Sequence, residues 1–162
     1  MTTTTKVDLK KELKHLYTAS PKEVAIIDVP EMSFLMIDGQ GDPNVSQEYK
    51  DALETLYALS YTLKFMVKRG PDGIDYSVMA LEGLWWTDDM SQFSQDNKGM
   101  WKWTAMIMQP QWVTPKLVAE ARDQLAQKKS PPALSKVRFE ALREGLSAQI
   151  MVCADYRTCN SV

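Results

Sequence analysis

The sequence predicts an α+β domain in which an antiparallel sheet carries helices packed on one face. Segments with the two-residue alternation of strands are interleaved with segments that have the periodicity of helices. Their order is strand, helix, strand, strand, helix, strand, and breaks rich in glycine and proline separate them. Antiparallel pairing with the helices on one face is the natural arrangement for this order.

Residues 1–20 are expected to form a polar lead-in. Within it, Leu9, Leu13 and Leu16 have helical spacing and predict a short amphipathic helix over residues 6–17 that packs on the body.

Two extended runs follow, over residues 24–29 and 33–37, with Pro30 and Glu31 between them. Residues 39–44 are then a strong turn signal, because their glycines permit positive φ and their proline ends strand pairing.

A long helix is predicted over residues 46–68, capped by Asn44 or Ser46 and ended by the Gly-Pro-Asp-Gly run at residues 70–73. Its expected buried face consists of the side chains at helical spacing, which are Leu53, Leu56, Tyr57, Ser60, Leu63 and Val67.

A hairpin is predicted next, with strands over residues 75–82 and 101–109 and a long polar loop over residues 87–99. The alternation places Glu82 on one face with Tyr76, Val78 and Ala80. It also gives Trp101 and Trp103 a common face.

Thr114 followed by Pro115 is a good helix start, and this helix is expected to run to about residue 129. Residues 137–142 form an ambiguous short element, residues 146–154 a final strand, and the last residues a polar tail.

The composition excludes several classes of protein. The chain has 162 residues, which fits one domain, and a net charge of −2 without a basic patch, so direct nucleic-acid binding is not expected. No apolar run has the length of a membrane span, and the N-terminus lacks the apolar centre of a signal peptide. A cytoplasmic protein that does not enter membranes is therefore predicted.

Metal and thiol chemistry are not expected either. The two cysteines, Cys153 and Cys159, form no disulfide framework or metal motif, and the single histidine, His15, lies in a charged segment with nothing to poise it for catalysis. We predict no metal and no cofactor.

All five tryptophans lie between positions 85 and 112, just after Glu82. Aromatic faces bind flat or cationic organic molecules, and a carboxylate at the wall of such a pocket adds charge selectivity or a proton acceptor. The alternative is that the tryptophans simply fill a core. A small-molecule pocket is the sharper hypothesis, built from Glu82, Trp85, Trp101, Trp103, Tyr61, Trp112 and Met36. Glu82 would be a counter-charge for a cationic ligand or a catalytic base that activates water.

Several motifs resemble the GyrI-like (gyrase-inhibitor-like) family of small-molecule-binding domains. The resemblance runs from about residue 22 to residue 156. Its carriers, in order, are Val29-Pro30-Glu31, Ile37-Asp38-Gly39-Gln40-Gly41-Asp42-Pro43-Asn44, Leu56-Tyr57-Ala58-Leu59-Ser60-Tyr61, Leu81-Glu82-Gly83-Leu84-Trp85, Gln109-Pro110 with Val113-Thr114, and Glu144-Gly145-Leu146. Their order and spacing are similar to a free-standing, bacterial-type subgroup.

The resemblance implies an SHS2-type effector-binding fold, with two βαββ modules around an aromatic and acidic cleft. Glu82 and Trp85 match the cleft motif, and Trp101 and Trp103 lie on the matching third strand. The domain would span residues 21–156, with a second module that opens at residues 146–154 and is incomplete, followed by a tail over residues 157–162. Unpaired edges would then favour a homodimer. The alternative is a compact one-module variant in which residues 115–154 cover the sheet.

The leading functional prediction is a xenobiotic-binding protein of the multidrug-recognition kind, with an aromatic cage for planar hydrophobic or cationic ligands. One alternative, implied by the resemblance, is a hydrolase that opens the strained cyclopropyl rings of DNA-alkylating natural products. Another is a regulatory or interaction protein related to the effector domains of transcription regulators.

Overall fold

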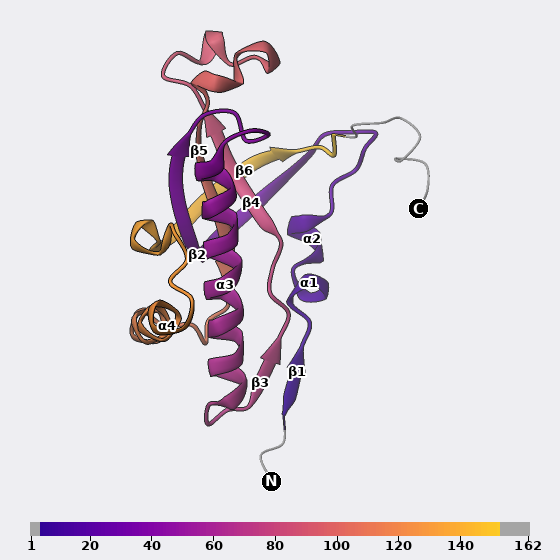
Figure 1. Ribbon diagram of the computed structural model, residues 1–162. Coiled ribbons are helices and arrows are strands. Elements are labelled where there is room, and N and C mark those ends of the chain that lie inside the picture. The colour runs from indigo at the N-terminus through magenta and orange to yellow at the C-terminus, as the bar shows by residue number, and fades with distance from the viewer. Residues whose placement is uncertain (1–3, 153–162) are drawn as a thin grey trace.

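A computed structural model describes residues 4–152 of the chain and has the α+β fold that the sequence predicts (Figure 1). A four-stranded antiparallel sheet has the strand order β4-β5-β2-β6, and β1 and β3 form a separate parallel pair. The elements are β1 (Thr5–Val7), α1 (Leu9–Glu12), α2 (Lys14–Tyr17), β2 (Ala25–Gln40), α3 (Gln47–Arg69), β3 (Ile74–Tyr76), β4 (Leu81–Trp86), β5 (Lys102–Gln109), α4 (Pro115–Lys128) and β6 (Arg138–Gln149).

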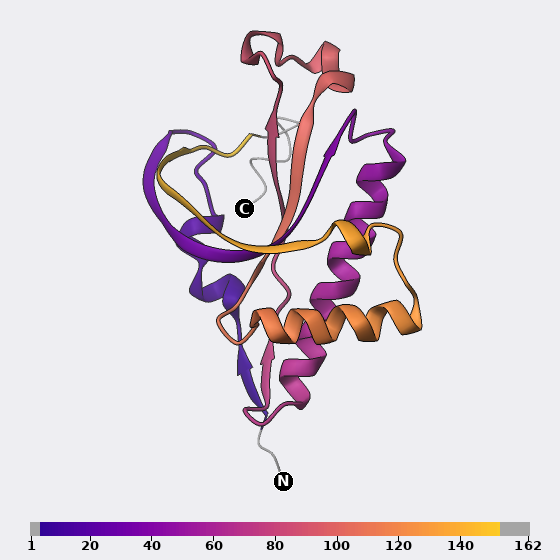
Figure 2. The same ribbon diagram turned by 90° about the vertical axis from the view of Figure 1, so that its left-hand side faces the viewer.

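β2 is one continuous strand, so the predicted division into two extended runs is wrong. Residues 33–40 pair with β5, while residues 25–36 pair with β6. Pro30 falls where β2 has a neighbour on one side only, and such an edge accommodates a residue without an N–H. Residues 25–32 of β2 and 142–149 of β6 form a two-stranded extension that curls away from the rest of the sheet (Figure 2). We call this extension the arm.

β6 begins at Arg138, so the ambiguous residues 137–142 and the predicted final strand belong to one element that ends at Gln149. Charged residues on this half-exposed strand hide its alternation, and Gly145, at φ 70°, interrupts it. Residues 153 and 154 of the predicted strand, Cys153, Cys159 and the predicted tail over residues 157–162 lie outside the described residues.

The predicted strand over residues 75–82 is split. Residues 74–76 pair in parallel with residues 5–7 as β3 and β1, and the sheet strand β4 starts only at Leu81. Tyr76, Val78 and Ala80 therefore do not share a strand face with Glu82. Residues 6 and 7, the start of the predicted lead-in helix, belong to β1 and are therefore a strand.

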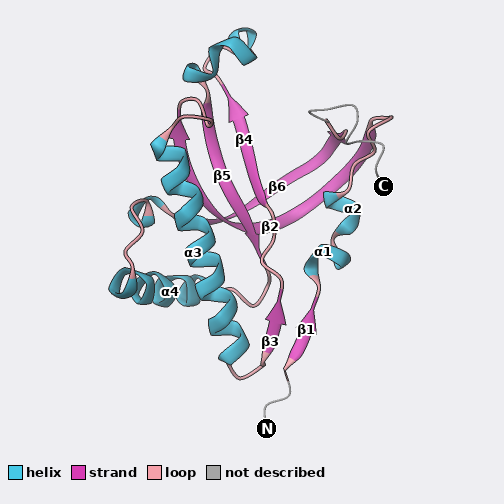
Figure 3. Cartoon of the chain, turned by 45° about the vertical axis from the view of Figure 1, so that its right-hand side comes forward, coloured by secondary structure: helices cyan, strands magenta, loops and turns pink. Residues whose placement is uncertain are grey.

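The lead-in is helical only in the two short elements α1 and α2. Its contacts with the body are nevertheless as predicted, since Leu9 and Leu16 are buried. Both elements lie beside the arm (Figure 3).

The two long helices confirm the helical predictions closely. The Ser46 hydroxyl caps α3 by accepting from the Tyr49 N–H at 3.2 Å, and the Thr114 hydroxyl caps α4 by accepting from the Leu117 N–H at 3.2 Å. Leu56, Leu59 and Leu63 of α3 are completely buried against the sheet. Tyr57, which we expected on this face, is 37% exposed because it lies to one side of that stripe.

The main core lies between the sheet and α3. Leu35 and Ile37 of β2, with Trp103 and Ile107 of β5, are fully buried there. Gly39 is required beside Trp103, because a Cβ at this position would come within 2.3 Å of the indole ring. None of the described helices combines the length and the apolar character that a membrane crossing requires.

Candidate functional site

Glu82, the carboxylate that the sequence singles out, is hydrogen bonded to a tyrosine from the lead-in. The Tyr17 hydroxyl, at the end of α2, donates to Glu82 Oε1 over 2.6 Å. Both side chains are partly buried. The pair joins two segments that are 65 positions apart in the sequence.

This pair lines a cavity of about 290 Å³ between α2, β4 and the arm. Glu144 of β6 lines the same cavity and adds a second carboxylate. We call this cavity the acidic cleft, and its lining consists of Leu16, Tyr17, Ile27, Val29, Met32, Glu82, Glu144, Ser147, Ala148 and Gln149.

Two hydrogen bonds hold the arm against the lead-in and so fix the width of the acidic cleft. The Gln149 side-chain amide donates to the carbonyl oxygen of Leu16 over 2.7 Å. The Met151 N–H donates to the carbonyl oxygen of Ser20 over 3.0 Å. The segment that carries Tyr17 is therefore held by hydrogen bonds from Gln149, at the end of β6, and from Met151.

Burial raises the pKa of Glu82, the hydrogen bond from Tyr17 works in the opposite direction, and the negative charge of Glu144 raises it further. Burial also raises the pKa of Tyr17, and its hydrogen bond to Glu82 and the charges of Glu82 and Glu144 add to this. Tyr17 therefore keeps its proton at neutral pH and remains the donor. Glu82 is a carboxylate of increased basicity with one oxygen already held in place.

The predicted aromatic pocket has a different geometry. Glu82 and Trp85 are an odd number of positions apart on β4, so they point to opposite faces of the sheet. Trp85 lies opposite Trp103 of β5, on the face that α3 covers.

The tryptophans on that face pack against one another and their aromatic neighbours. The ring centre of Tyr49 lies 5.5 Å from Trp85 and 5.0 Å from Trp103, and Trp85 lies 5.8 Å from Trp101. Trp101 is also stacked on Phe93 at 4.6 Å. We call these five side chains the aromatic cluster. The structure does not bring Trp85, Trp101 and Trp103 together with Glu82.

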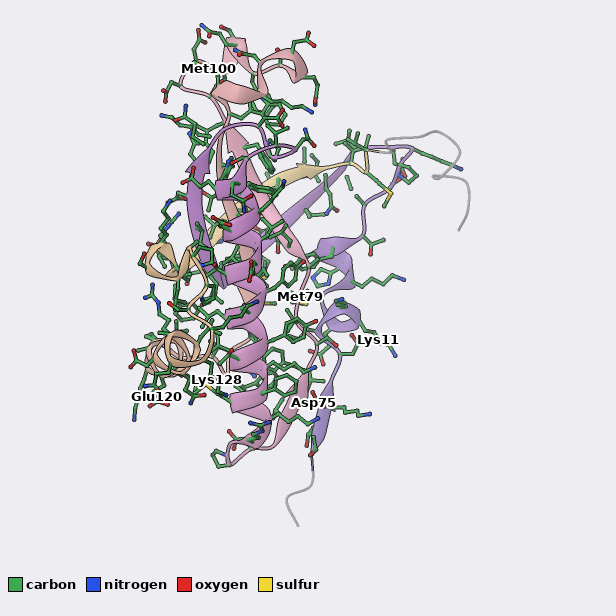
Figure 4. All side chains as sticks on the ribbon, in the orientation of Figure 1. Lys11, Asp75, Met79, Met100, Glu120 and Lys128 are labelled. Atoms are coloured by element: carbon green, nitrogen blue, oxygen red, sulfur yellow. The ribbon has the colours of Figure 1, made fainter. Side chains whose placement is uncertain are left out.

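The other three candidate residues are dispersed. Met36 is 3% exposed and sits within the sheet. Tyr61 is 48% exposed and lines a groove between α3 and α4, which Glu120 and Lys128 also line (Figure 4). Trp112 lines a second cavity, beside α1. None of the three lines the acidic cleft.

Sequence reasoning missed Tyr17 and Glu144. Tyr17 lies in a segment for which the sequence predicts only a polar lead-in. Glu144 belongs to the Glu144-Gly145-Leu146 motif, but nothing in that motif predicts a role in a site. No local pattern connects either residue with Glu82, because their proximity depends on the curl of the arm. Among residues 4–152, no three side chains of His, Cys, Asp or Glu are grouped in a way that would hold a metal ion.

Fold and site together define an α+β protein whose four-stranded sheet is extended by a curled arm, with paired carboxylates in the hollow of that arm. Solved structures with a similar fold exist. A crystal structure of an uncharacterized conserved protein from Listeria innocua is 36% identical, with a TM-score of 0.83, and the match covers 93% of this chain and 74% of that one.

Two crystal structures described as hydrolases from Listeria innocua are each 37% identical, with TM-scores of 0.82 and 0.78. These matches cover 94% and 93% of this chain and 74% and 73% of those chains. No protein-family model and no curated protein matches the chain. The chain belongs to the same family as these Listeria innocua proteins.

Proposed function

We propose that this protein is a small-molecule hydrolase that works in the acidic cleft, with Glu82 as general base. The hydrogen bond of 2.6 Å from Tyr17 to Glu82, at the wall of a cavity of about 290 Å³, is the observation that carries the proposal. Tyr17 is the positioning residue, since it acts through the carboxylate. The two relatives described as hydrolases support this class of reaction.

In the proposed reaction, one oxygen of Glu82 accepts the bond from Tyr17 and the other accepts a proton from water. The water oxygen then attacks an electrophilic carbon of the bound substrate. A raised pKa suits this role, because a general base is most effective when its pKa lies near the working pH. The negative charge of Glu144 contributes to the raised pKa of Glu82 and so strengthens this base.

The substrate that we propose carries a strained cyclopropyl ring conjugated to a carbonyl group, as the resemblance to GyrI-like proteins implies. The water oxygen bonds to a ring carbon while one ring C–C bond breaks. The electron pair of that bond moves to the carbonyl oxygen, which takes up a proton, while Glu82 gives up the proton that it accepted from water. The net change is the addition of one water. Ile27, Val29 and Met32 supply apolar walls for such a ligand.

A binding protein without turnover is the second candidate, and it would use the same cleft. The apolar walls beside two carboxylates suit hydrophobic ligands that are neutral or cationic. Membership in the GyrI-like family, a homodimer and a regulatory role stay predictions from the sequence.

The test is turnover of a spirocyclopropyl cyclohexadienone, whose dienone absorbance disappears when water opens the ring. We expect Glu82→Gln to lower the rate by a factor of about 10² to 10⁴, the usual contribution of a general base. The matched control is Glu23→Gln, which removes an exposed carboxylate that does not line the cleft.

Binding of the same compound, followed by calorimetry, separates the two candidates. Binding that persists in Glu82→Gln while turnover is lost supports the hydrolase. Saturable binding to the natural sequence without any turnover favours the binding protein. Equal rates in Glu82→Gln and Glu23→Gln would contradict the assignment of Glu82.

A further inference from the structure

The outer face of α3 carries a row of exposed aromatic side chains. Tyr57, Tyr61 and Phe65 follow one another at four-residue spacing, so they are neighbours along one side of the helix. They are 37%, 48% and 44% exposed. The solvent side of an amphipathic helix normally carries polar or charged residues at such positions. We call these three side chains the α3 ridge, and Figure 1 shows α3 in front of the sheet.

A groove of about 540 Å³ runs beside the α3 ridge, between α3 and α4. Tyr61 and Phe65 form one of its walls together with Met66, and Leu117 of α4 adds apolar surface to the other. A projecting row and a hollow therefore lie side by side on this surface. Two helices that pack on each other interlock through features of this kind.

The α3 ridge has a charged residue of opposite sign at each end. Glu54 precedes it and Arg69 follows it, and both are exposed. The Arg69 guanidinium lies over the Phe65 ring, 5.8 Å from its centre, which keeps the positive charge beside the ridge. Among residues 4–152, Arg69 is in no ion pair. Glu54 is paired with Lys129 over 2.7 Å, but both side chains remain exposed, and a carboxylate accepts from more than one donor.

This order of residues makes the α3 ridge complementary to a reversed copy of itself. When a second α3 runs antiparallel with the two Tyr61 side chains opposite each other, Tyr57 faces the partner's Phe65. Glu54 then faces the partner's Arg69, and the symmetry repeats both contacts. A two-fold interface requires self-complementarity of this kind. A shallow crossing angle, of about 20°, keeps both charged ends of the helices within reach.

We propose that the chain associates with a second copy of itself through the α3 ridges, which pack antiparallel about a two-fold axis. The ridge offers less area than the about 800 Å² per partner of a standard interface, so the dimer is weak and forms at micromolar concentrations. The interface differs from the unpaired sheet edges on which the sequence-based expectation of a homodimer rests. It is also independent of the proposed hydrolysis, because α3 covers the face of the sheet opposite to Glu82.

The experiment is sedimentation equilibrium of the full chain across the micromolar concentration range. A monomer–dimer equilibrium is expected. Tyr61→Glu places two carboxylates against each other at the axis and should raise the dissociation constant at least about tenfold. The matched control is Leu146→Glu, which puts the same carboxylate at an apolar position of the arm that is 79% exposed, and it should leave the equilibrium unchanged. Circular dichroism checks that both variants are folded.

An exchange of charges tests the antiparallel pairing itself. Glu54→Arg and Arg69→Glu should each weaken self-association about tenfold, since two symmetry-related pairs change at once and an exposed pair contributes up to a factor of about five. An equimolar mixture of the two single variants should associate again, because both pairs then have opposite charges.

Four results would overturn the proposal. They are a natural-sequence protein that stays monomeric at every concentration, a dimer that Tyr61→Glu leaves intact, a dimer that Leu146→Glu disrupts, and a mixture of the two charge variants that associates no better than either alone. Unfolding measured well below the dissociation constant reports the monomer only, so effects on stability are read separately.

Discussion

The two faces of β4 differ in a way that separates stability from chemistry. On one face, Trp85 joins the aromatic cluster under α3, where rings cover rings and Trp103 is completely buried. On the other face, Glu82 lines an open cavity with a single hydroxyl partner, Tyr17. β4 thus contributes Trp85 to the packing on one face of the sheet and Glu82 to the candidate site on the other face.

A cluster of tryptophans in the sequence is therefore not by itself evidence of a ligand site. Five tryptophans close together in the sequence suggest a ligand cage. Three of them, Trp85, Trp101 and Trp103, instead pack their rings against other aromatic side chains of the protein. The acidic cleft uses common residue types from distant positions. What distinguishes it is the partial burial of one carboxylate, Glu82, that has no basic partner among the described residues. Such burial costs free energy and is typical of functional sites.

The largest effect that we expect is on stability, in Trp103→Ala. This variant removes a fully buried indole and should lower the free energy of unfolding by about 3 to 5 kcal/mol. Urea unfolding measures the loss. Tyr61→Ala, at an exposed aromatic position, should change it by less than about 0.5 kcal/mol. A Trp103→Ala protein of unchanged stability that no longer binds ligand would contradict the core role of the aromatic cluster and would make that cluster the site.

Tyr17→Phe should have an intermediate effect, on activity. The rate should fall by a factor of about 10 to 160, because a hydrogen bond to a charged group contributes about 1.5 to 3 kcal/mol. The pH profile gives the sharper readout. Activity needs ionised Glu82, so it rises with pH through the pKa of Glu82. Tyr17 lowers that pKa, so its loss should move the rising limb to higher pH.

Glu144→Gln should move the same limb in the opposite direction, because the charge of Glu144 raises the pKa of Glu82. Tyr57→Phe, at an exposed position on α3, is the control and should leave the profile in place. Shifts of the same sign in Tyr17→Phe and Glu144→Gln would contradict the electrostatic description of the acidic cleft.

The smallest effect concerns Asp38, a carboxylate that is well supplied with partners. Burial acts to raise the pKa of Asp38, but hydrogen bonds from Arg138 and Thr104 outweigh it and lower the pKa below its usual value. Its contribution to stability is therefore present above the usual pKa of aspartate and is lost as the pH falls through the lowered one. Glu82 has the opposite sign, since its raised pKa removes stability as the pH rises.

Asp38→Asn should accordingly cost at most about 1 kcal/mol at neutral pH, because the ion pair is exposed. Thermal unfolding at neutral and at strongly acidic pH checks this, and the difference from the natural sequence should vanish in acid. Asp28→Asn, an exposed position on the arm, serves as the control. A difference that persists in acid would show that the charge of Asp38 is not its cause.

Much of the fold could be predicted because much of it is encoded locally. The helices α3 and α4 have their periodicity and their caps, Ser46 and Thr114, in adjacent residues, and β5 has its alternation. The alternation over residues 75–82 predicts one strand and does not reveal that β4 begins only at Leu81. The continuity of β2 and the pairing of Thr5 with Ile74 depend on contacts between distant segments, which no local pattern reveals.

The residues of the candidate site also differ in whether the local sequence reveals them. Glu82 could be singled out because it stands in a motif and beside the tryptophans. The alternation showed that Trp101 and Trp103 share a face, but whether that face is core or cleft depends on where α3 packs. Tyr17 and Glu144 could not be predicted, because only the folded positions of the arm and the lead-in bring them close to Glu82.

The position of Tyr17 also has an evolutionary consequence. Both glutamates of the acidic cleft belong to the sheet, while the tyrosine and one wall of the second cavity, beside α1, come from the first 17 residues. A recombination event near codon 20 would therefore exchange the hydroxyl and reshape both cavities while it leaves every strand of the sheet unchanged.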